Sequence, residues 1–216
     1  MRACAAFLLL LLAQIVAGAL AVLTTHWPLI QAGQPVAGLV PDAVNFGIAL
    51  LGCESLLALG LWLWTRRDVP LKCWTSRPFR PALEFAAALA VTLGLNVFFS
   101  WLAETYGWDD GGAGVLFEQM RGSAPCWLLL CVVGPLCEEL VMRSCVLRTF
   151  VERGLPVWLS VGLSALLFGL LHGNWMQGIA AFVIGIPLGL MYLRTGNLRL
   201  CLPVHILNNT AALLFL

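Results

Sequence analysis

The sequence predicts an all-α fold, a polytopic membrane bundle of about seven transmembrane helices. Two observations predict it. Hydrophobic residues make up 61% of the 216 residues, charged residues make up 11%, and the mean hydropathy is +0.92, far outside the range of soluble proteins. The apolar residues also gather in runs of about 20, the length that crosses a bilayer as a helix. The seven runs are residues 3–24, 43–64, 82–102, 125–150, 156–172, 175–193 and 198–216.

The first three runs are separated by charged segments. Arg2 precedes the first run, Asp42 precedes the second, and a basic segment at 66–80 precedes the third. The first run also has the features of a secretory signal peptide, namely a basic start, a leucine-rich centre and small residues near its end. We favour a signal anchor that stays in the membrane, because no translocated domain follows. Cleavage is the alternative, and it would leave the later spans unchanged.

The last four runs are separated by short turns. The fourth run carries its charges in its second half, and Gly173 with Asn174 separates the fifth from the sixth. Arg194 and Arg199 flank the turn before the seventh run. The segment 104–123, which lies between the third and fourth runs, is rich in Gly and Asp. It predicts a solvated turn, with a lid as the alternative.

Basic residues predict the orientation of the bundle. If seven spans alternate, eleven of the twelve Lys and Arg residues lie toward one side and only Arg121 lies toward the other. Because cytoplasmic loops carry an excess of Lys and Arg, we expect a cytoplasmic N-terminus and an external C-terminus. The basic side holds Arg2, Arg66, Arg67, Lys72, Arg77, Arg80, Arg143, Arg148, Arg153, Arg194 and Arg199, and the opposite loops hold Asp42, Glu104, Asp109, Asp110 and Glu118.

Three ionisable residues interrupt the fourth run. Glu138, Glu139 and Arg143 follow directly on residues 127–137, which carry no charge. A charge near the middle of a bilayer costs about 2.5 kcal/mol or more, so a protein that keeps three of them is expected to use them. Residues four apart share a helix face, so Glu139 and Arg143 can neutralise each other. Glu138 lies about 100° around the helix and faces another partner.

Two later runs carry polar pairs with the same spacing. Phe168 and His172 share a face of the fifth run, and His205 and Asn209 share a face of the seventh. At about 1.5 Å of rise per residue, these groups and Glu138 lie at overlapping depths in the bilayer. We therefore expect one polar cavity inside the bundle, where intramembrane ionisable groups usually face.

The groups expected in this cavity fit hydrolysis of a peptide bond. A carboxylate in an apolar pocket, here Glu138, can act as a base near neutral pH, and the imidazole of His172 could share the deprotonation of a water. His205 and Asn209 could donate hydrogen bonds to the oxyanion that forms when water attacks an amide carbonyl.

Cysteine is frequent but indicates packing. The chain has eight, most of them inside apolar runs, and no pair has CxxC spacing. In packed helices cysteine behaves as a small hydrophobe. Ser144 and Cys145 lie near the charged motif, but neither belongs to a GxSxG or a Cys/His signature of a nucleophile.

The three motifs, in this order and spacing, resemble those of the family of CAAX prenyl endopeptidases and bacteriocin-processing enzymes. The family pattern is EExxxR, then FxxxH, then HxxxN, on successive helices of a membrane core. The chain reads EELVMR at 138–143, FGLLH at 168–172 and HILNN at 205–209. The resemblance covers about residues 125–216, and the first three spans show no match. One departure is Ser144, which follows Arg143 where relatives often carry Gly.

The resemblance implies an intramembrane endopeptidase of the glutamate type. A single transmembrane domain, 1–216, would hold three N-terminal spans and loops in 1–123 and a catalytic core in 124–216. The catalytic residues would be Glu138 and His172, which activate water, and His205 and Asn209, which stabilise the oxyanion. The supporting residues would be Glu139, Arg143 and Phe168.

The expected partners and cofactors follow from the same resemblance. The substrate would be a membrane-anchored protein or peptide, for example one with a C-terminal sorting tail or a CAAX-like tail. The short loops point to a prokaryotic member of the family in the bacterial inner membrane. A net charge of +1 gives no indication of nucleic-acid binding. No cofactor is expected. Zinc is the alternative, since Glu138, His172 and His205 could supply three ligands with an open position, although the sequence has no HExxH.

Two other classes of function use the same residues. A proton-coupled transporter could employ the Glu and His groups as a relay, although the few polar side chains in the first three spans argue against a polar pathway. A non-proteolytic membrane scaffold, or a bacteriocin-immunity protein, could keep the motifs for packing.

Overall fold

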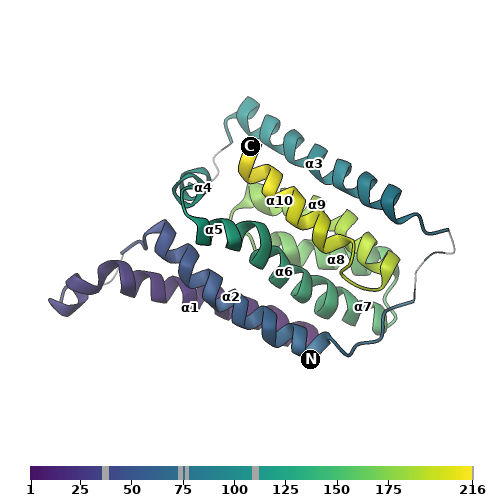
Figure 1. The fold of residues 1–216 in the computed structure, drawn as a ribbon, viewed down its shortest axis with the longest axis horizontal. Coiled ribbons are helices and arrows are strands. Elements are labelled where there is room, and N and C mark those ends of the chain that lie inside the picture. The colour runs from purple at the N-terminus through teal and green to yellow at the C-terminus, as the bar shows by residue number, and fades with distance from the viewer. Residues whose placement is uncertain (36–38, 73–74, 76–77, 109–111, 216) are drawn as a thin grey trace.

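The computed structural model describes residues 1–35, 39–72, 75, 78–108 and 112–215. Within these residues the regular structure is helical and there is no strand, which confirms the all-α prediction (Figure 1). Arg77, Asp109, Asp110 and Leu216, which the sequence assigned to loops and to the last span, lie outside the described residues. The helices are α1 (Arg2–Gln31), α2 (Ala43–Thr65), α3 (Pro81–Tyr106), α4 (Ala113–Arg121), α5 (Ala124–Leu128), η1 (Leu129–Val133), α6 (Gly134–Glu139), η2 (Leu140–Leu147), α7 (Arg148–Glu152), α8 (Val157–Leu170), α9 (Trp175–Thr195) and α10 (Cys201–Phe215).

Each of the seven predicted spans corresponds to a helix, but their lengths differ. Five are long and apolar enough to cross a bilayer, and these are α1, α2, α3, the continuous run Ala124–Glu152 and α9. The apolar helices α8 and α10 have only 14 and 15 residues, so each rises about 21–23 Å, less than the hydrocarbon core of about 30 Å. Turns rather than helix make up the remainder of those two predicted runs within the described residues.

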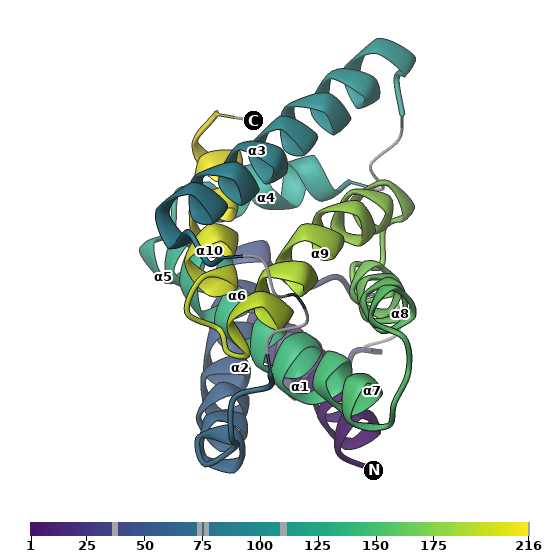
Figure 2. The same cartoon turned by 90° about the vertical axis from the view of Figure 1, so that its right-hand side faces the viewer.

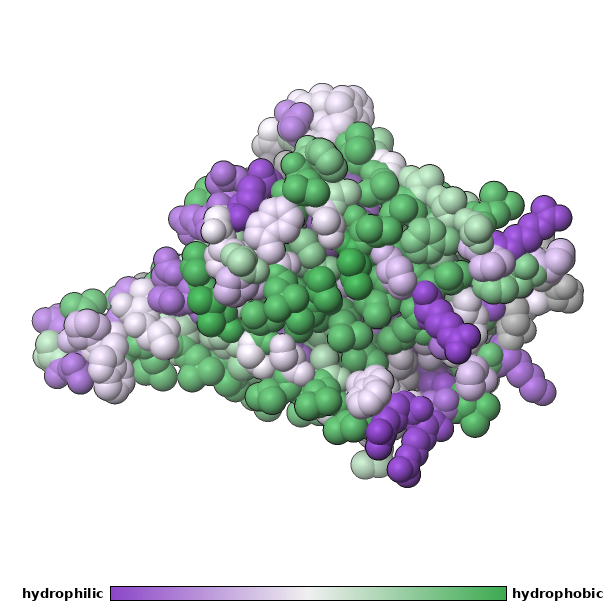
Figure 3. All heavy atoms as spheres, in the orientation of Figure 1, coloured by the Kyte–Doolittle hydropathy of each residue, from purple (hydrophilic) through white to green (hydrophobic). Residues whose placement is uncertain are grey.

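The surface agrees with a membrane-embedded protein. Hydrophobic side chains cover the middle of the face drawn in Figure 3, and hydrophilic side chains gather toward its two ends. Exposed large apolar residues occur along α1, α2 and α3, for example Leu8, Leu56 and Val97. Lipid rather than water suits such a surface, so the chain is an integral membrane protein.

The helix ends meet in two groups. Arg2 at the start of α1 forms an ion pair with Asp68 beyond the end of α2 (2.8 Å), and Arg148 of α7 lies 3.8 Å from the same carboxylate. Arg194 at the end of α9 pairs with Glu84 at the start of α3 (2.9 Å). We call this the basic end. The opposite end carries α4 and is called the α4 end.

The bundle has two flanks around a central layer. Figures 1 and 2 show α1 and α2 paired on one flank and α3 on the other, with the helices from α5 to α10 between them. Leu10 of α1 is fully buried in the core that η2 also enters. Helix α3 is packed less tightly, since Ala88 and Thr92 are its only buried residues. It contacts α9 and α10, and its Asn96 side chain donates to Asn208 of α10 (2.9 Å).

The prediction of a solvated turn is wrong for residues 113–121, which form the helix α4. Met120 of this helix is buried with Ala43 and Cys126 in a small apolar cluster. Gly47 of α2 makes room for that contact, because a Cβ there would lie 2.6 Å from the Met120 methyl group. An apolar anchor at the end of a Gly-rich segment thus holds α4 against α2.

Helices α8 and α9 approach each other through two glycines. A Cβ on Gly169 would lie 2.5 Å from the carbonyl oxygen of Gly178, and a Cβ on Gly178 would lie 2.9 Å from that of Gly169. Small residues allow such close backbone approach, which is the usual basis of helix packing in membranes. The end of α8 near His172 is therefore fixed against α9.

This contact predicts the effect of a single methyl group. Gly169→Ala should lower the free energy of unfolding by about 1–3 kcal/mol, because the two backbones must separate. Gly162→Ala on the same helix is the control, since no atom lies within 4 Å of its Cβ position. Thermal unfolding of both variants in detergent micelles would measure the difference. Equal midpoints would contradict the packing described here.

Candidate active site

The two glutamates lie in a helix with an irregular hydrogen-bond pattern. The run Ala124–Glu152 is continuous, but π-helical turns η1 and η2 flank the short α-helix α6, which carries Glu138 and Glu139. Pro135 at the start of α6 has no N–H to donate, which interrupts the α-helical ladder there. π-Helical turns often occur at functional sites, because they redirect side chains within a helix.

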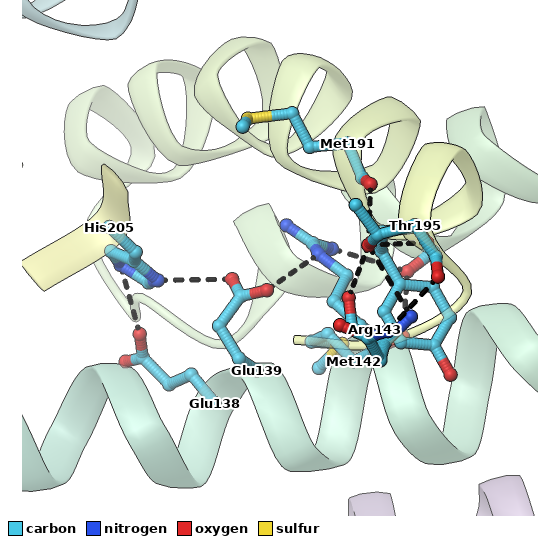
Figure 4. A network of polar contacts seen from close by, with 10 residues as sticks. Glu138, Glu139, Met142, Arg143, Met191, Thr195 and His205 are labelled. Carbon is cyan, nitrogen blue, oxygen red and sulfur yellow. Dashed lines mark hydrogen bonds and ion pairs between the residues drawn. The ribbon is translucent and has the colours of Figure 1, made fainter. Parts of the chain in front are cut away.

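Glu139 and Arg143 form a buried ion pair beneath the site, as the spacing predicted. Their side chains are almost fully buried, and Arg143 Nε lies 3.2 Å from Glu139 Oε2. The second carboxylate oxygen, Oε1, lies 3.0 Å from Nδ1 of His205 (Figure 4). A carboxylate can only accept, so Nδ1 of His205 carries the hydrogen of this bond. One carboxylate thus joins α6 and η2 to α10.

Arg143 is held from two further directions. Its Nη1 donates to Ser164 Oγ of α8 (3.4 Å), and Ser164 Oγ donates in turn to the Met142 carbonyl (3.1 Å). Its guanidinium lies over the ring of Phe168, 5.4 Å from the ring centre. The ion pair, the hydrogen bond and the aromatic face together stabilise this buried guanidinium.

Glu138 faces the other ring nitrogen of His205. Its Oε2 lies 3.5 Å from His205 Nε2, and 24% of its side chain is exposed. Both nitrogens of His205 therefore face carboxylate oxygens, so each N–H of an imidazolium would have an acceptor. No hydrogen bond or ion pair between Glu138 and His172 occurs among the described residues. The side chain that pairs with Glu138 is His205.

His172 is placed by the turn between α8 and α9. Helix α8 ends at Leu170, Gly173 turns the chain with a φ of 59°, and Asn174 caps α9 by accepting from the Met176 amide (2.9 Å). His172 Nδ1 lies 3.0 Å from the Phe168 carbonyl oxygen. Because a carbonyl only accepts, Nδ1 carries the hydrogen, and Nε2 of a neutral His172 is left as an acceptor.

Phe168 and Asn209 complete the predicted set. The Phe168 ring meets His172 and His205 edge-to-face, with centroids 5.0 and 5.7 Å apart. It therefore separates the two imidazoles and fixes their orientation. The Asn209 amide donates to the Leu130 carbonyl of η1 (3.2 Å), which ties α10 to the irregular helix.

These side chains surround one cavity. Its volume is about 630 Å³, within the range of ligand sites. Glu138, Phe168, His172, His205 and Asn209 line it, as the sequence predicted for a shared polar cavity. Glu139 and Arg143 lie behind this wall and support it. The geometry brings the predicted residues together, and the catalytic roles assigned to them stay predictions.

The sequence interpretation missed contributions from the first three helices. Gln14 of α1, Glu54 of α2 and Asn96 of α3 also line the cavity, as do Glu118 and Arg121 of α4. A signal for Glu54 was present, because it is the only charged residue in the run 43–64. A lone carboxylate inside a span indicates a functional position.

The three residues that the sequence offered as alternative zinc ligands are Glu138, His172 and His205. Among the described residues, no three His, Cys, Asp or Glu side chains are grouped as a metal site. Glu138 and His205 lie close to each other, whereas His172 hydrogen-bonds through Nδ1 to the Phe168 carbonyl and keeps Nε2 as an acceptor. A zinc site with an open position needs three convergent ligands. The prediction that no cofactor is needed stays a prediction.

Comparison with known proteins agrees with the motifs. Residues 120–211 match the family model described as type II CAAX prenyl endopeptidase Rce1-like. Over these residues the chain is similar to the CAAX prenyl endopeptidase family. The matched segment contains all seven residues predicted from the motifs, whereas Glu54 lies outside it. At the level of the family, this match supports a CAAX-type intramembrane protease. No curated protein and no solved structure matches the chain.

The buried ion pair predicts a large effect on stability. Arg143→Met should cost about 3–5 kcal/mol, because it leaves the Glu139 carboxylate buried without its cation. Arg121→Met is the control, since its pair with Glu118 is long (3.7 Å) and exposed, and such pairs contribute about 0–1 kcal/mol. Denaturant unfolding in micelles would compare the two. A stable Arg143→Met variant would show that the pair is dispensable.

Proposed function

We propose that the protein is a glutamate-type intramembrane endopeptidase that hydrolyses a peptide bond of a membrane-anchored protein. The observation that carries the proposal is the cavity itself. It gathers a partly exposed carboxylate, two imidazoles and a carboxamide from α6, from α10 and from the turn after α8, inside an apolar bundle. These are the groups that attack by water and stabilisation of an oxyanion require.

In the proposed reaction, a water between Glu138 and the substrate carbonyl carbon is the nucleophile. Glu138 takes a proton from this water while its oxygen bonds to the carbon, and His172 Nε2 is a second acceptor that orients the water. The C–N bond of the tetrahedral intermediate then breaks. The proton held by Glu138 passes to the leaving nitrogen, so the products are a carboxylic acid and an amine.

The negative oxygen of the intermediate needs donors. Asn209 has a second amide hydrogen beyond the one it gives to Leu130. His205 in its imidazolium form offers Nε2–H, while its Nδ1–H is held by Glu139. Fixed donors of this kind stabilise a developing charge without reorganisation. Glu139 and Arg143 take no direct part and hold His205 in position.

The proposed mechanism involves no cofactor. The water, the acceptors Glu138 and His172, and the donors His205 and Asn209 account for each proton transfer and each charge. Among the described residues, the His and Glu side chains form no group of three metal ligands. The substrate we propose is a membrane-anchored protein with a cleavable C-terminal sorting tail or CAAX-like tail. The bacterial inner membrane is the location that the short loops favour.

The cavity also indicates the side from which substrate arrives. Its lining on the central helices ends at Phe168, Ile184 and His205, and it includes the exposed Glu118 of α4. It therefore reaches the α4 end and stops short of the basic end. With the basic end in the cytoplasm, the N-terminus is cytoplasmic, the C-terminus is external, and the cavity is open to the outer side.

Tags on the two termini test this orientation. In intact spheroplasts, an external protease should remove a tag placed after Leu216, because that terminus is outside. A tag placed before Met1 should be digested only after lysis. The reverse pattern would invert the proposed side of access.

The decisive variant is Glu138→Gln, which keeps the size of the side chain and removes its basicity. Mass spectrometry of N- and C-terminal peptides should show new protein termini in membranes that hold the wild type and none with Glu138→Gln. Glu104→Gln is a matched control, because it makes the same change at an exposed site outside the cavity.

The opposite results have definite meanings. New termini that persist with Glu138→Gln would exclude Glu138 as the catalytic base. Identical termini with the wild type and with the variant, at equal expression, would favour a scaffold or immunity role. Proton flux in liposomes that depends on Glu138 would instead favour a transporter.

A further inference from the structure

Glu54 is the buried charge that the proposed mechanism leaves unused. It lies in α2, only 4% of its surface is exposed, and it lines the cavity. Its Oε2 is buried and has no hydrogen-bond partner. The other buried acidic, basic and histidine side chains of the described chain have ion pairs or hydrogen bonds, and they are Glu139, Arg143, Arg148 and His205.

The carboxylate lies beside the catalytic helix. Oε2 of Glu54 lies 3.6 Å from the position that a Cβ on Gly134 would occupy, so the carboxylate packs against the bare backbone of α6. Gly134 precedes Glu138 by four residues, which corresponds to about 6 Å along the helix. An extended peptide covers that distance in about two residues. A substrate bound for attack at Glu138 would thus place a neighbouring residue next to Glu54.

The charges of the lining favour a cation at this position. Glu54, Glu118 and Glu138 line the cavity, and Arg121 is the only Lys or Arg among the lining residues of the described chain. Arg121 already pairs with Glu118 (3.7 Å). An unpaired carboxylate buried in this way costs several kcal/mol, which a bound counter-charge offsets.

The cation that fits is organic. A metal ion would need further ligands, and the described residues form no group of three His, Cys, Asp or Glu side chains around Glu54. A lysine or arginine side chain brings one charge and several N–H donors on a long apolar stem, which suits a cavity with apolar walls such as Leu50 and Leu129. Gln14 of the neighbouring helix lines the same cavity and offers a further acceptor.

We propose that Glu54 is a specificity residue that binds a lysine or arginine side chain of the substrate within about two residues of the cleaved bond. The inference rests on the proposed endopeptidase function and adds a substrate class to it. It also gives the N-terminal helices a task in recognition, because Glu54 lies outside the segment that matches the family.

A peptide library tests the inference. The purified full-length protein in detergent micelles is incubated with proteome-derived peptides whose ends are not enriched in Lys or Arg, and the cleaved bonds are identified by mass spectrometry. Lys and Arg should be enriched within two residues of the bonds that the wild type cleaves. The enrichment should disappear with Glu54→Gln and persist with Glu54→Asp, which keeps the charge, and with Glu104→Gln.

Kinetics on one cleaved peptide make the test quantitative. Replacing its Lys by norleucine should lower kcat/KM of the wild type about ten- to hundredfold, the value of a hydrogen-bonded charge pair, and should have little effect on Glu54→Gln. Melting curves of the variants establish that they are folded. If Glu54→Gln does not fold, a wild type without the enrichment still overturns the role of Glu54.

The outcomes separate the two proposals. Cleavage that requires Glu138 but shows no preference for Lys or Arg would overturn the role of Glu54 and leave the protease intact. A preference that survives Glu54→Gln would do the same. No cleavage by the wild type, or equal cleavage by Glu138→Gln, would overturn the endopeptidase function, and the inference on Glu54 would fall with it.

Discussion

The Glu139 carboxylate is the group on which the arrangement of the cavity depends. One of its oxygens lies 3.2 Å from the Arg143 guanidinium and the other lies 3.0 Å from the His205 ring. Buried charges are stable only when each is paired, so Arg143 and His205 must lie where this carboxylate can reach them. The position of His205 fixes α10, and Ser164 beneath Arg143 fixes α8. The Glu139–Arg143 pair, which does not face the cavity, thus determines the positions of the side chains that do.

The same logic separates two kinds of intramembrane charge. Glu139 and Arg143 are compensated by protein groups and have no surface exposed to the cavity. Glu138 and Glu54 face the cavity, and they are only partly compensated or not compensated at all. A charge that the protein leaves unpaired is available to a ligand. On the short helix α6 the two adjacent glutamates thus point about 100° apart, Glu138 toward the cavity and Glu139 toward the buried ion pair.

Local spacing in the sequence predicted much of this site, because helix periodicity relates residues four apart. The Glu139–Arg143 pair, the Phe168–His172 face and the shared cavity followed from it. Contacts between distant helices did not. Nothing in the spacing indicates that His205 rather than His172 pairs with Glu138, since that depends on how α8 and α10 pack. Helix α4 was missed because a buried Met120, rather than periodicity, stabilises it. Glu54 was missed because it lies alone on α2, outside any motif.

The π-helical turns have a consequence for the way this helix tolerates change in length. A π turn contains one residue more than an α turn, so η1 could lose a residue and close into a regular α-helix. The side chains beyond the deletion would keep their directions, because the π turn and the α turn each complete about one full circle. The same deletion in a helix that is already regular would rotate every later side chain by about 100°, so Glu139 would leave His205 and Glu138 would leave the cavity. The π turns therefore let this part of the chain lose a residue without a change in the direction of the two glutamates.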